Sequence, residues 1–265
     1  MNQLAFQQTH AVVTGASSGI GRAIATSLAR KGVERMVIHY CKNADGAQAT
    51  AKACAEHGAA TVVIPCNLTS SESIQAFASA CFVELGEVHT WVNNAGADVL
   101  TGAGASLSFD EKLKRLMQVD VLGTIELSRL VAERLMKQPS ARPSSMTFIG
   151  WDQASEGMEG DAGQMFGPVK TAVTAYAKSL AQSVAPKLRV NTIAPGWIRT
   201  SWGESTDPYW NRRAKEQSLM YRWGTPDDVA LAVLFASDPA NTFFTGQLVR
   251  VNGGWNRRSP RSEKE

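Results

Sequence analysis

The chain is poor in cysteine, which limits the redox and metal chemistry open to it. Its 265 residues include four cysteines, and no two of them form a Cys-x-x-Cys pair. The four histidines also lack the spacing of metal ligands, so we expect no metal site. We interpret the cysteines as small buried apolar residues of a protein in a reducing compartment. The residues concerned are Cys41, Cys54, Cys66, Cys81, His10, His39, His57 and His89.

Long apolar runs and a strong excess of one charge are absent as well. No run approaches the ~20 apolar residues of a membrane-spanning helix, and the first ten residues lack the charged and apolar regions of a signal peptide. The formal net charge is only +3, which gives no sign of a nucleic-acid partner. We therefore expect a cytoplasmic protein that binds neither membranes nor nucleic acids.

What the sequence does contain is a regular alternation of strand-like and helix-like runs. This alternation predicts an α/β fold with a doubly wound, seven-stranded parallel sheet and helices on both faces. A hydrophobic fraction of 44% is ample for one core, so we expect a single domain over 6–255 and a charged, disordered tail over 256–265. The expected strands are 11–14, 35–40, 61–65, 89–93, 145–149, 189–193 and 247–251. The expected helices are 19–31, 44–57, 71–85, 109–138, 163–184, 206–218 and 226–237.

A glycine-rich turn near the N-terminus is the first candidate site. An apolar run ends at Thr14, three glycines follow, and a helical pattern begins at once. Free N–H groups and the positive end of a helix dipole make such a turn a site for a diphosphate. The alternative is an ordinary strand-to-helix connection. The candidate residues are Gly15, Ser17, Ser18, Gly19, Ile20 and Gly21.

The end of the second strand predicts which dinucleotide binds. An acidic residue there would accept from the ribose 2′-hydroxyl of NAD(H), but Tyr40 is followed by Cys41 and Lys42. One cation and no carboxylate favour a 2′-phosphate, hence NADP(H) over NAD(H); the alternative is a lysine that simply faces solvent. At the end of the third strand, Asn67 and Leu68 are candidates for the adenine site, although Asn67 could instead cap a turn.

Four ordered motifs carry a resemblance to a known family. They are Thr14-Gly15-Ala16-Ser17-Ser18-Gly19-Ile20-Gly21, Asn93-Asn94-Ala95-Gly96, Arg189 to Thr200 with Pro195-Gly196 at its centre, and the C-terminal pair Trp223 to Ala230 and Thr245 to Gly254. Together they resemble the short-chain dehydrogenase/reductase family, nearest to the β-ketoacyl-carrier-protein reductases.

The resemblance implies further cofactor contacts and an assembly. Asn93 and Gly96 would shape the floor of the nicotinamide site, the Ile198 backbone would hold the carboxamide, and Thr200 would reach the phosphates. Ala95, Pro195 and Gly196 complete the cofactor positions. The resemblance also implies a homo-oligomer, a dimer or a tetramer, formed through the two long helices near 109–138 and 163–184.

The resemblance breaks at the catalytic positions. Family members that reduce ketones carry a tyrosine that donates a proton, a lysine four residues later, a serine after the fifth strand and an asparagine on the preceding long helix. In this chain Lys170 matches the lysine, while Phe166 stands at the tyrosine position, Trp151 at the serine position and Asp120 at the asparagine position. Ordinary ketone reduction is therefore not expected.

Three interpretations remain open. The first is an NADP(H)-dependent oxidoreductase whose carbonyl-like, iminium or activated double-bond substrate needs no proton from a phenol, with Lys170 holding the nicotinamide ribose. The second is that a loop carboxyl, Asp152, Glu156 or Asp161, replaces the phenol as the acid, while Asp120 pairs with Lys170; solvation is the alternative for each loop carboxyl. The third is a non-catalytic NADP(H)-binding sensor or partner subunit.

Aromatic residues are dense before the C-terminal motif, in a region that the resemblance identifies as a substrate lid. With Trp151 and Phe166 they predict an aromatic-walled pocket for a flat or bulky apolar small molecule, unless they only pack the lid or an oligomer interface. Tyr176 has no lysine four residues later and is expected to pack. Ser155 could shift into the place of the missing serine, but the tyrosine would still be missing. The lid aromatics are Trp197, Trp202, Tyr209, Trp210, Tyr221 and Trp223.

Overall fold

Seven parallel strands form one sheet in the order β3-β2-β1-β4-β5-β6-β7 in the computed structural model. The structure describes residues 5–139, 144–204 and 206–256, without the side chain of Trp202. All seven expected strands are present, so the predicted doubly wound fold is confirmed. The strands are β1 His10–Val13, β2 Arg35–Tyr40, β3 Ala60–Pro65, β4 Thr90–Asn93, β5 Ser144–Ile149, β6 Leu188–Pro195 and β7 Leu248–Val251.

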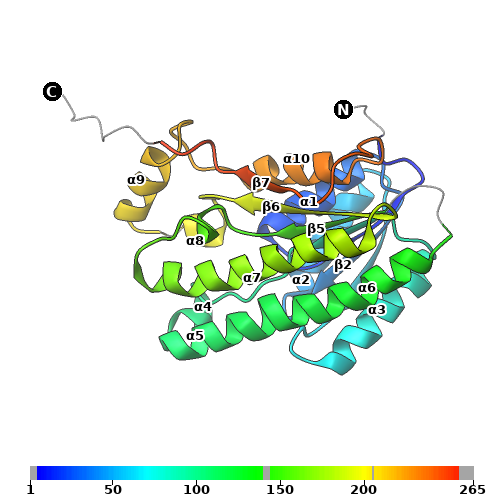
Figure 1. Ribbon diagram of the computed structural model, residues 1–265, viewed down its shortest axis with the longest axis horizontal. Coiled ribbons are helices and arrows are strands. Elements are labelled where there is room, and N and C mark those ends of the chain that lie inside the picture. The colour runs from blue at the N-terminus through cyan, green and yellow to red at the C-terminus, as the bar shows by residue number, and fades with distance from the viewer. Residues whose placement is uncertain (1–4, 140–143, 205, 257–265) are drawn as a thin grey trace.

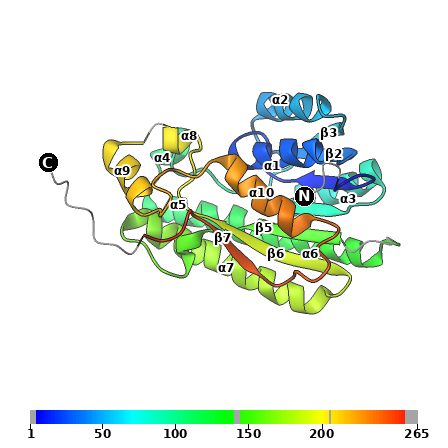
Figure 2. The same ribbon diagram turned by 90° about the horizontal axis from the view of Figure 1, so that it is seen from above.

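Helices cover both faces of the sheet, as Figures 1 and 2 show. One face carries α1 Gly19–Arg30, α2 Ala44–Ala55 and α10 Pro226–Ser237, and the other carries α3 Ser71–Leu85, α5 Phe109–Leu116, α6 Thr124–Lys137 and α7 Gly160–Val184. Shorter pieces are α4 Gly102–Ala105, the 3-10 helix η2 Asp152–Ala154, α8 Ser201–Glu204 and α9 Pro208–Glu216.

Each face has its own apolar core, because the strands are buried on both sides. Trp91 and Phe148 belong to the core under α3, α6 and α7, and both side chains are fully buried. Ile38 and Val92 belong to the core under α1, α2 and α10. Because all the strand pairs are parallel, the carboxyl ends of the strands emerge at one edge of the sheet.

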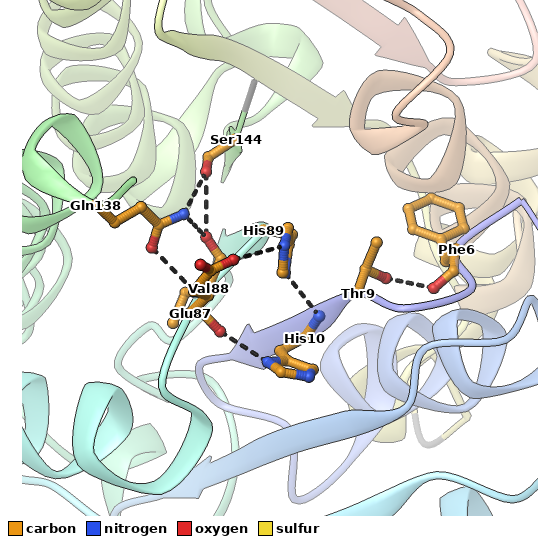
Figure 3. Close-up of polar contacts among 8 residues, drawn as sticks. All are labelled: Phe6, Thr9, His10, Glu87, Val88, His89, Gln138 and Ser144. Carbon is orange, nitrogen blue, oxygen red and sulfur yellow. Dashed lines mark hydrogen bonds and ion pairs between the residues drawn. The ribbon is translucent and has the colours of Figure 1, made fainter. Parts of the chain in front are cut away.

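Polar contacts tie the strands together at the opposite edge, where they begin (Figure 3). The backbone N–H of His10 donates to Nδ1 of His89 at 3.0 Å, and Gln138 exchanges two hydrogen bonds with the backbone of Val88. Among the described residues, no group of three or more histidine, cysteine, aspartate or glutamate side chains could hold a metal ion. These histidines therefore join strand ends in the described part of the chain.

The long helix expected over 109–138 is interrupted, which corrects the prediction. Residues Met117–Gly123 form a π-helix, η1, between α5 and α6. A Cβ atom on Gly123 would lie 2.1 Å from the Leu68 carbonyl oxygen, so the backbone passes very close to the loop after β3. Because that contact and those of Asp120 involve residues far away in sequence, helical periodicity alone does not predict the wider turn. Most of the expected tail, residues 257–265, lies outside the described residues.

Candidate functional site

The glycine turn after β1 meets the loop after β4 at the carboxyl edge, where the strand order reverses. Gly15 and Gly19 have φ angles of +62° and +52°, a region that favours glycine. A Cβ on Gly15 would lie 2.7 Å from the Cα of Ala95, and one on Gly21 would lie 2.3 Å from the Gly15 carbonyl oxygen. The two segments thus meet at the reversal of strand order, which is where doubly wound folds bind dinucleotides.

The N-terminus of α1 fits a diphosphate. Ser18 is the N-cap residue, but its side chain does not cap the helix. The backbone N–H groups in the first turn of α1, from Gly19 to Gly21, therefore receive no hydrogen-bond acceptor from the Ser18 side chain. They lie at the positive end of the helix dipole. The side chain of Ser17 is half-buried, and that of Ile20 packs against the core of this face.

His39 supports this turn, a role that our sequence interpretation missed. Its Nδ1 accepts from the Gly15 N–H at 2.8 Å, and its Nε2 lies 3.1 Å from the Cys66 carbonyl oxygen. The two contacts fix a neutral ring with the proton on Nε2. Burial lowers the pKa of His39 to about 4, against a partial opposing effect of the Cys66 carbonyl. A histidine at a buried strand position was the signal available in the sequence.

The residues expected at the adenosine side lie together at the ends of β2 and β3. Tyr40 is half-buried and Lys42 is exposed, without a carboxylate between them. The Asn67 side-chain oxygen accepts from the backbone N–H and the hydroxyl of Thr69, so it caps a turn, which was the alternative interpretation. Leu68 is buried in the core beneath.

The end of β4 packs against the glycine turn. Asn93 is buried, its Oδ1 accepts from the Trp91 indole at 3.0 Å, and its Nδ2 has no partner among the described residues. The Asn94 amide donates to the carbonyl oxygens of Thr14 and Gly15, which joins β4 to the glycine turn. A Cβ on Gly96 would lie 2.8 Å from Oδ2 of Asp120, so the glycine leaves room for that carboxylate.

Asp120 and Lys170 form a buried ion pair. Nζ of Lys170 lies 3.0 Å from Oδ2 of Asp120, and the two side chains are 15% and 3% exposed. The other carboxylate oxygen accepts from the Ala97 N–H at 2.7 Å, and Lys170 also lies 3.4 Å from the Ile149 carbonyl oxygen. The ion pair that the sequence predicted is thus present, on the π-helix η1. Among the described residues, no tyrosine hydroxyl contacts this ammonium.

Two aromatic rings stand beside the pair. Phe166 precedes Lys170 by one turn of α7, and its ring centroid lies 6.3 Å from that of Trp151, edge to face. Trp151 directly follows Gly150 after β5. Neither ring carries a hydroxyl, and the one hydrogen-bond donor that they offer together is the indole N–H of Trp151.

The loop carboxyls have different environments. Asp152 is 2% exposed, and its Oδ2 accepts from the Asn252 amide at 3.0 Å, while its Oδ1 has no partner among the described residues. Burial raises its pKa to about 6, more than the Asn252 hydrogen bond lowers it. Glu156 pairs with Arg250, and Ser155 also contacts Arg250, so neither is simply solvated. Asp161 is exposed.

Tyr176 packs in the core, as predicted. Its ring contacts Phe148 edge to face at 5.9 Å, and its hydroxyl is buried without a partner among the described residues. Burial raises its pKa to about 12. A general acid needs a lowered pKa, so this tyrosine is unsuited to replace the missing one.

The segment after β6 crosses the glycine turn and leads into the aromatic region. A Cβ on Gly19 would lie 3.7 Å from Cγ2 of Thr200, and one on Gly196 would lie 3.1 Å from Oδ2 of Asp152. Pro195 ends β6, and Ile198 forms an isolated bridge with Gly224. The expected residues of the glycine turn, the β4 loop and the β6 segment therefore meet at one edge.

Aromatic rings beyond β6 pack on one another. The ring centroid of Trp197 lies 5.7 Å from that of Trp210 and 6.1 Å from that of Trp223. The Trp197 indole donates to Gln217, and the Trp223 indole donates to Asn211. The side chain of Trp202 lies outside the described residues.

Within the described ranges, none of the helices combines the length and the apolar character that a membrane-spanning helix requires.

Comparison with known proteins gives one consistent answer. The family model for enoyl-(acyl carrier protein) reductase matches residues 15–256. The 3-oxoacyl-acyl-carrier-protein reductase of Vibrio cholerae is 33% identical over 247 residues, covering 92% of this chain and 96% of that protein. The 7α-hydroxysteroid dehydrogenase of Escherichia coli is 30% identical over 249 residues, covering 92% of each.

Solved structures agree with the sequence relatives. A 7α-hydroxysteroid dehydrogenase in complex with NADH and a 7-oxo bile acid superposes with a TM-score of 0.85 at 28% identity, covering 97% of this chain and 99% of that one. A short-chain dehydrogenase from Burkholderia cenocepacia in complex with NADP gives a TM-score of 0.83 at 25% identity, covering 96% and 99%. With its glycine turn, its sheet order and these relatives, the chain belongs to the short-chain dehydrogenase/reductase family of oxidoreductases.

Proposed function

We propose that the protein is an NADP(H)-dependent reductase that acts on an iminium ion or an activated double bond rather than on an ordinary ketone. The observation that carries this proposal is the surroundings of the Lys170 ammonium. It lies 3.0 Å from the Asp120 carboxylate, and the side chain one helical turn before it is a phenyl ring, Phe166. The site therefore has no phenol to protonate a carbonyl oxygen.

The end of β2 supports the choice of NADP(H), since the related structures include both nicotinamide cofactors. One related structure is in complex with NADP and another with NADH. Here the end of β2 offers the exposed Lys42 and no carboxylate, which favours the 2′-phosphate of NADP(H). NADPH would supply a hydride when bound. Gly19 to Gly21 would hold its diphosphate, and Lys170 would hold its nicotinamide ribose.

The electrostatics of the site suit a substrate that loses positive charge. Hydride addition to a ketone places negative charge on oxygen, and enzymes stabilise that charge with hydrogen-bond donors. Phe166 offers no donor, Trp151 offers only its indole N–H, and Asp120 neutralises Lys170. Hydride addition to an iminium ion removes a positive charge instead, and aromatic faces attract cations. The apolar walls also favour a flat or bulky substrate.

A matched pair of substrates tests the proposal. A cyclic imine and the ketone with the same ring skeleton are each incubated with protein and NADPH, and nicotinamide absorbance is followed. We expect consumption of NADPH with the imine and none with the ketone. If NADPH binds tightly but is not consumed with imines, quinones or ketones, a non-catalytic binding protein is favoured. If NADPH does not bind, both functions are excluded.

Where the substrate is an activated double bond, the second carbon needs a proton, and we propose Asp152 as its donor. This carboxyl is buried directly after Trp151, has one oxygen without a partner among the described residues and has a pKa raised to about 6. The protonated form decreases above that pH, so the rate with such a substrate should fall as the pH rises through about 6.

The variant Asp152→Asn keeps the size of the side chain and removes the titrating proton. We expect it to lose about 10²-fold in rate with a double-bond substrate and to show no fall near pH 6. Reduction of an iminium ion, whose nitrogen already carries its proton, needs no donor, so it serves as the internal control and should change little. An unchanged pH profile in the variant would exclude Asp152 as the acid.

A further inference from the structure

Helix α9 lies beyond the N-terminal end of α7 but has little core of its own. Of its residues, all of which the structure describes, only Ala214 is fully buried. Its attachment therefore depends on contacts along its sides. A helix with so little buried apolar surface opens at low free-energy cost unless specific side chains hold it.

Arg213 makes the most extensive of these contacts. Its guanidinium donates to both carboxylate oxygens of Glu159, one of them at 2.9 Å. It also lies over two indole rings, 5.2 Å from the centroid of Trp210 and 5.9 Å from that of Trp197. The Arg213 side chain is 13% exposed while that of Glu159 is 68% exposed. The Arg213 side chain is thus largely buried against the two indole rings, and its guanidinium group pairs with the Glu159 carboxylate.

The partners of Arg213 belong to both sides of the site. Trp197 follows the Pro195-Gly196 end of β6, and Glu159 is the N-cap residue of α7, seven positions before Phe166. The same arginine therefore joins α9 to the wall formed by β6 and to the helix that carries Phe166 and Lys170. Figures 1 and 2 show α9 beyond the N-terminal end of α7.

Two cavities run from the glycine turn to α9. One, of about 510 Å³, is lined by Gly19, Thr200 and Glu204 among others. The second, of about 440 Å³, shares Arg199 and Glu204 with the first and reaches Pro208 and Asn211 of α9. A displacement of α9 would therefore widen the second cavity, which adjoins the first at Arg199 and Glu204.

We propose that Arg213 is a positioning residue that locks α9 over this edge through Glu159 and thereby slows the release of the bound nicotinamide nucleotide. This lock, the attachment of α9 through the contacts of Arg213 with Glu159, Trp197 and Trp210, depends on contacts within the chain alone. Its effect on release rests on the proposed binding of NADP(H). The pair has an exposed carboxylate, so each single change should have a modest effect.

Hydrogen exchange of the nucleotide-free protein tests the lock. Amides of α9 should exchange about threefold faster in Glu159→Gln, and about tenfold faster in Arg213→Ala, which also loses the ring contacts. Arg213→Lys keeps the positive charge but loses the bidentate hydrogen bonding to the carboxylate, so its α9 amides should exchange about as fast as those of Glu159→Gln. The control is Glu133→Gln, which breaks the exposed Glu133–Lys137 pair on α6 and should leave α9 unchanged.

The release of NADPH, measured by stopped-flow displacement with excess NADP⁺, tests the consequence. The release rate should rise in the same order as the exchange of α9. Equal exchange in all variants would overturn the lock, and faster exchange with an unchanged release rate would overturn its effect on the nucleotide. If the wild type does not bind NADPH, the proposed cofactor fails, while the exchange experiment still decides the lock.

Discussion

The pairing of Lys170 with Asp120 is the feature at the residue scale on which the chemistry depends. Both side chains are largely buried, and the carboxylate also accepts from the Ala97 N–H. A buried pair of this kind contributes little net stability, because desolvation offsets the attraction, but removing one partner leaves a charge uncompensated. The pair therefore fixes the position of the ammonium more than it stabilises the fold.

The substitution Lys170→Met should lower the free energy of unfolding by about 3 kcal/mol, because it leaves the Asp120 carboxylate buried without its cation. Adding Asp120→Asn to that variant should restore much of the loss, since the amide oxygen can still accept from Ala97. Urea denaturation of the two variants and of Asp120→Asn alone measures the coupling. A loss in the double variant equal to the sum of the two single losses would show that the two groups do not interact.

His39 should make the stability depend on pH in the acid range. Its pKa in the folded protein is about 4, below its ordinary value of 6.5, so the unfolded chain binds the proton first as the pH falls. Stability should therefore decrease below about pH 6.5 and level off near pH 4, a loss of about 3 kcal/mol. The variant His39→Gln cannot titrate, and urea denaturation between these pH values should show a correspondingly flatter profile. An equally steep profile in the variant would assign the pH dependence to other groups.

At the scale of elements, the turn between β1 and α1 forms the phosphate side of the candidate site. A Cβ on Gly19 would make only an ordinary van der Waals contact with Cγ2 of Thr200, at 3.7 Å, so a side chain fits there without disturbing the core. Gly19→Asp should abolish NADPH binding, because its carboxylate would occupy and repel the diphosphate position at the helix N-terminus. Isothermal titration measures the affinity.

The matched control for that variant is Gly58→Asp. Gly58 also has a positive φ angle, +87°, and open space around it, but it lies in the loop after α2. The same backbone strain arises there without a diphosphate site. Equal loss of NADPH affinity in both variants would mean that strain in the fold, not the phosphate turn, is responsible.

The elements show which features a single sequence can predict. The seven strands and the glycine turn follow from local patterns, namely apolar runs, turn residues and helical spacing, and they were predicted. The π-helix at Asp120 and the His39 bridge depend on partners distant in the chain, such as Ala97, Gly15 and Cys66. Local periodicity contains no information on such contacts. The ion pair of Asp120 was predictable because the family pattern aligned both positions.

At the scale of the whole molecule, the family and the fold agree, while the assembly remains a prediction. Leu122 on η1 is 61% exposed, and Leu231, Phe235 and Phe243 are exposed on and after α10. Apolar side chains on both these surfaces are consistent with the dimer or tetramer that the family resemblance implies. The long helix around η1 was expected to contribute, whereas the surface near α10 was not.

The whole account depends on the site lacking the tyrosine and the serine of the ketone reductases. The double variant Phe166→Tyr with Trp151→Ser places a phenol one helical turn before Lys170 and a hydroxyl after β5. The most direct measurement is the rate of NADPH-dependent reduction of one bulky cyclic ketone by the wild type and by this variant. We predict no measurable reduction by the wild type and a gain of about 10²-fold or more in the variant. A wild type that already reduces the ketone as fast as the variant would contradict the account.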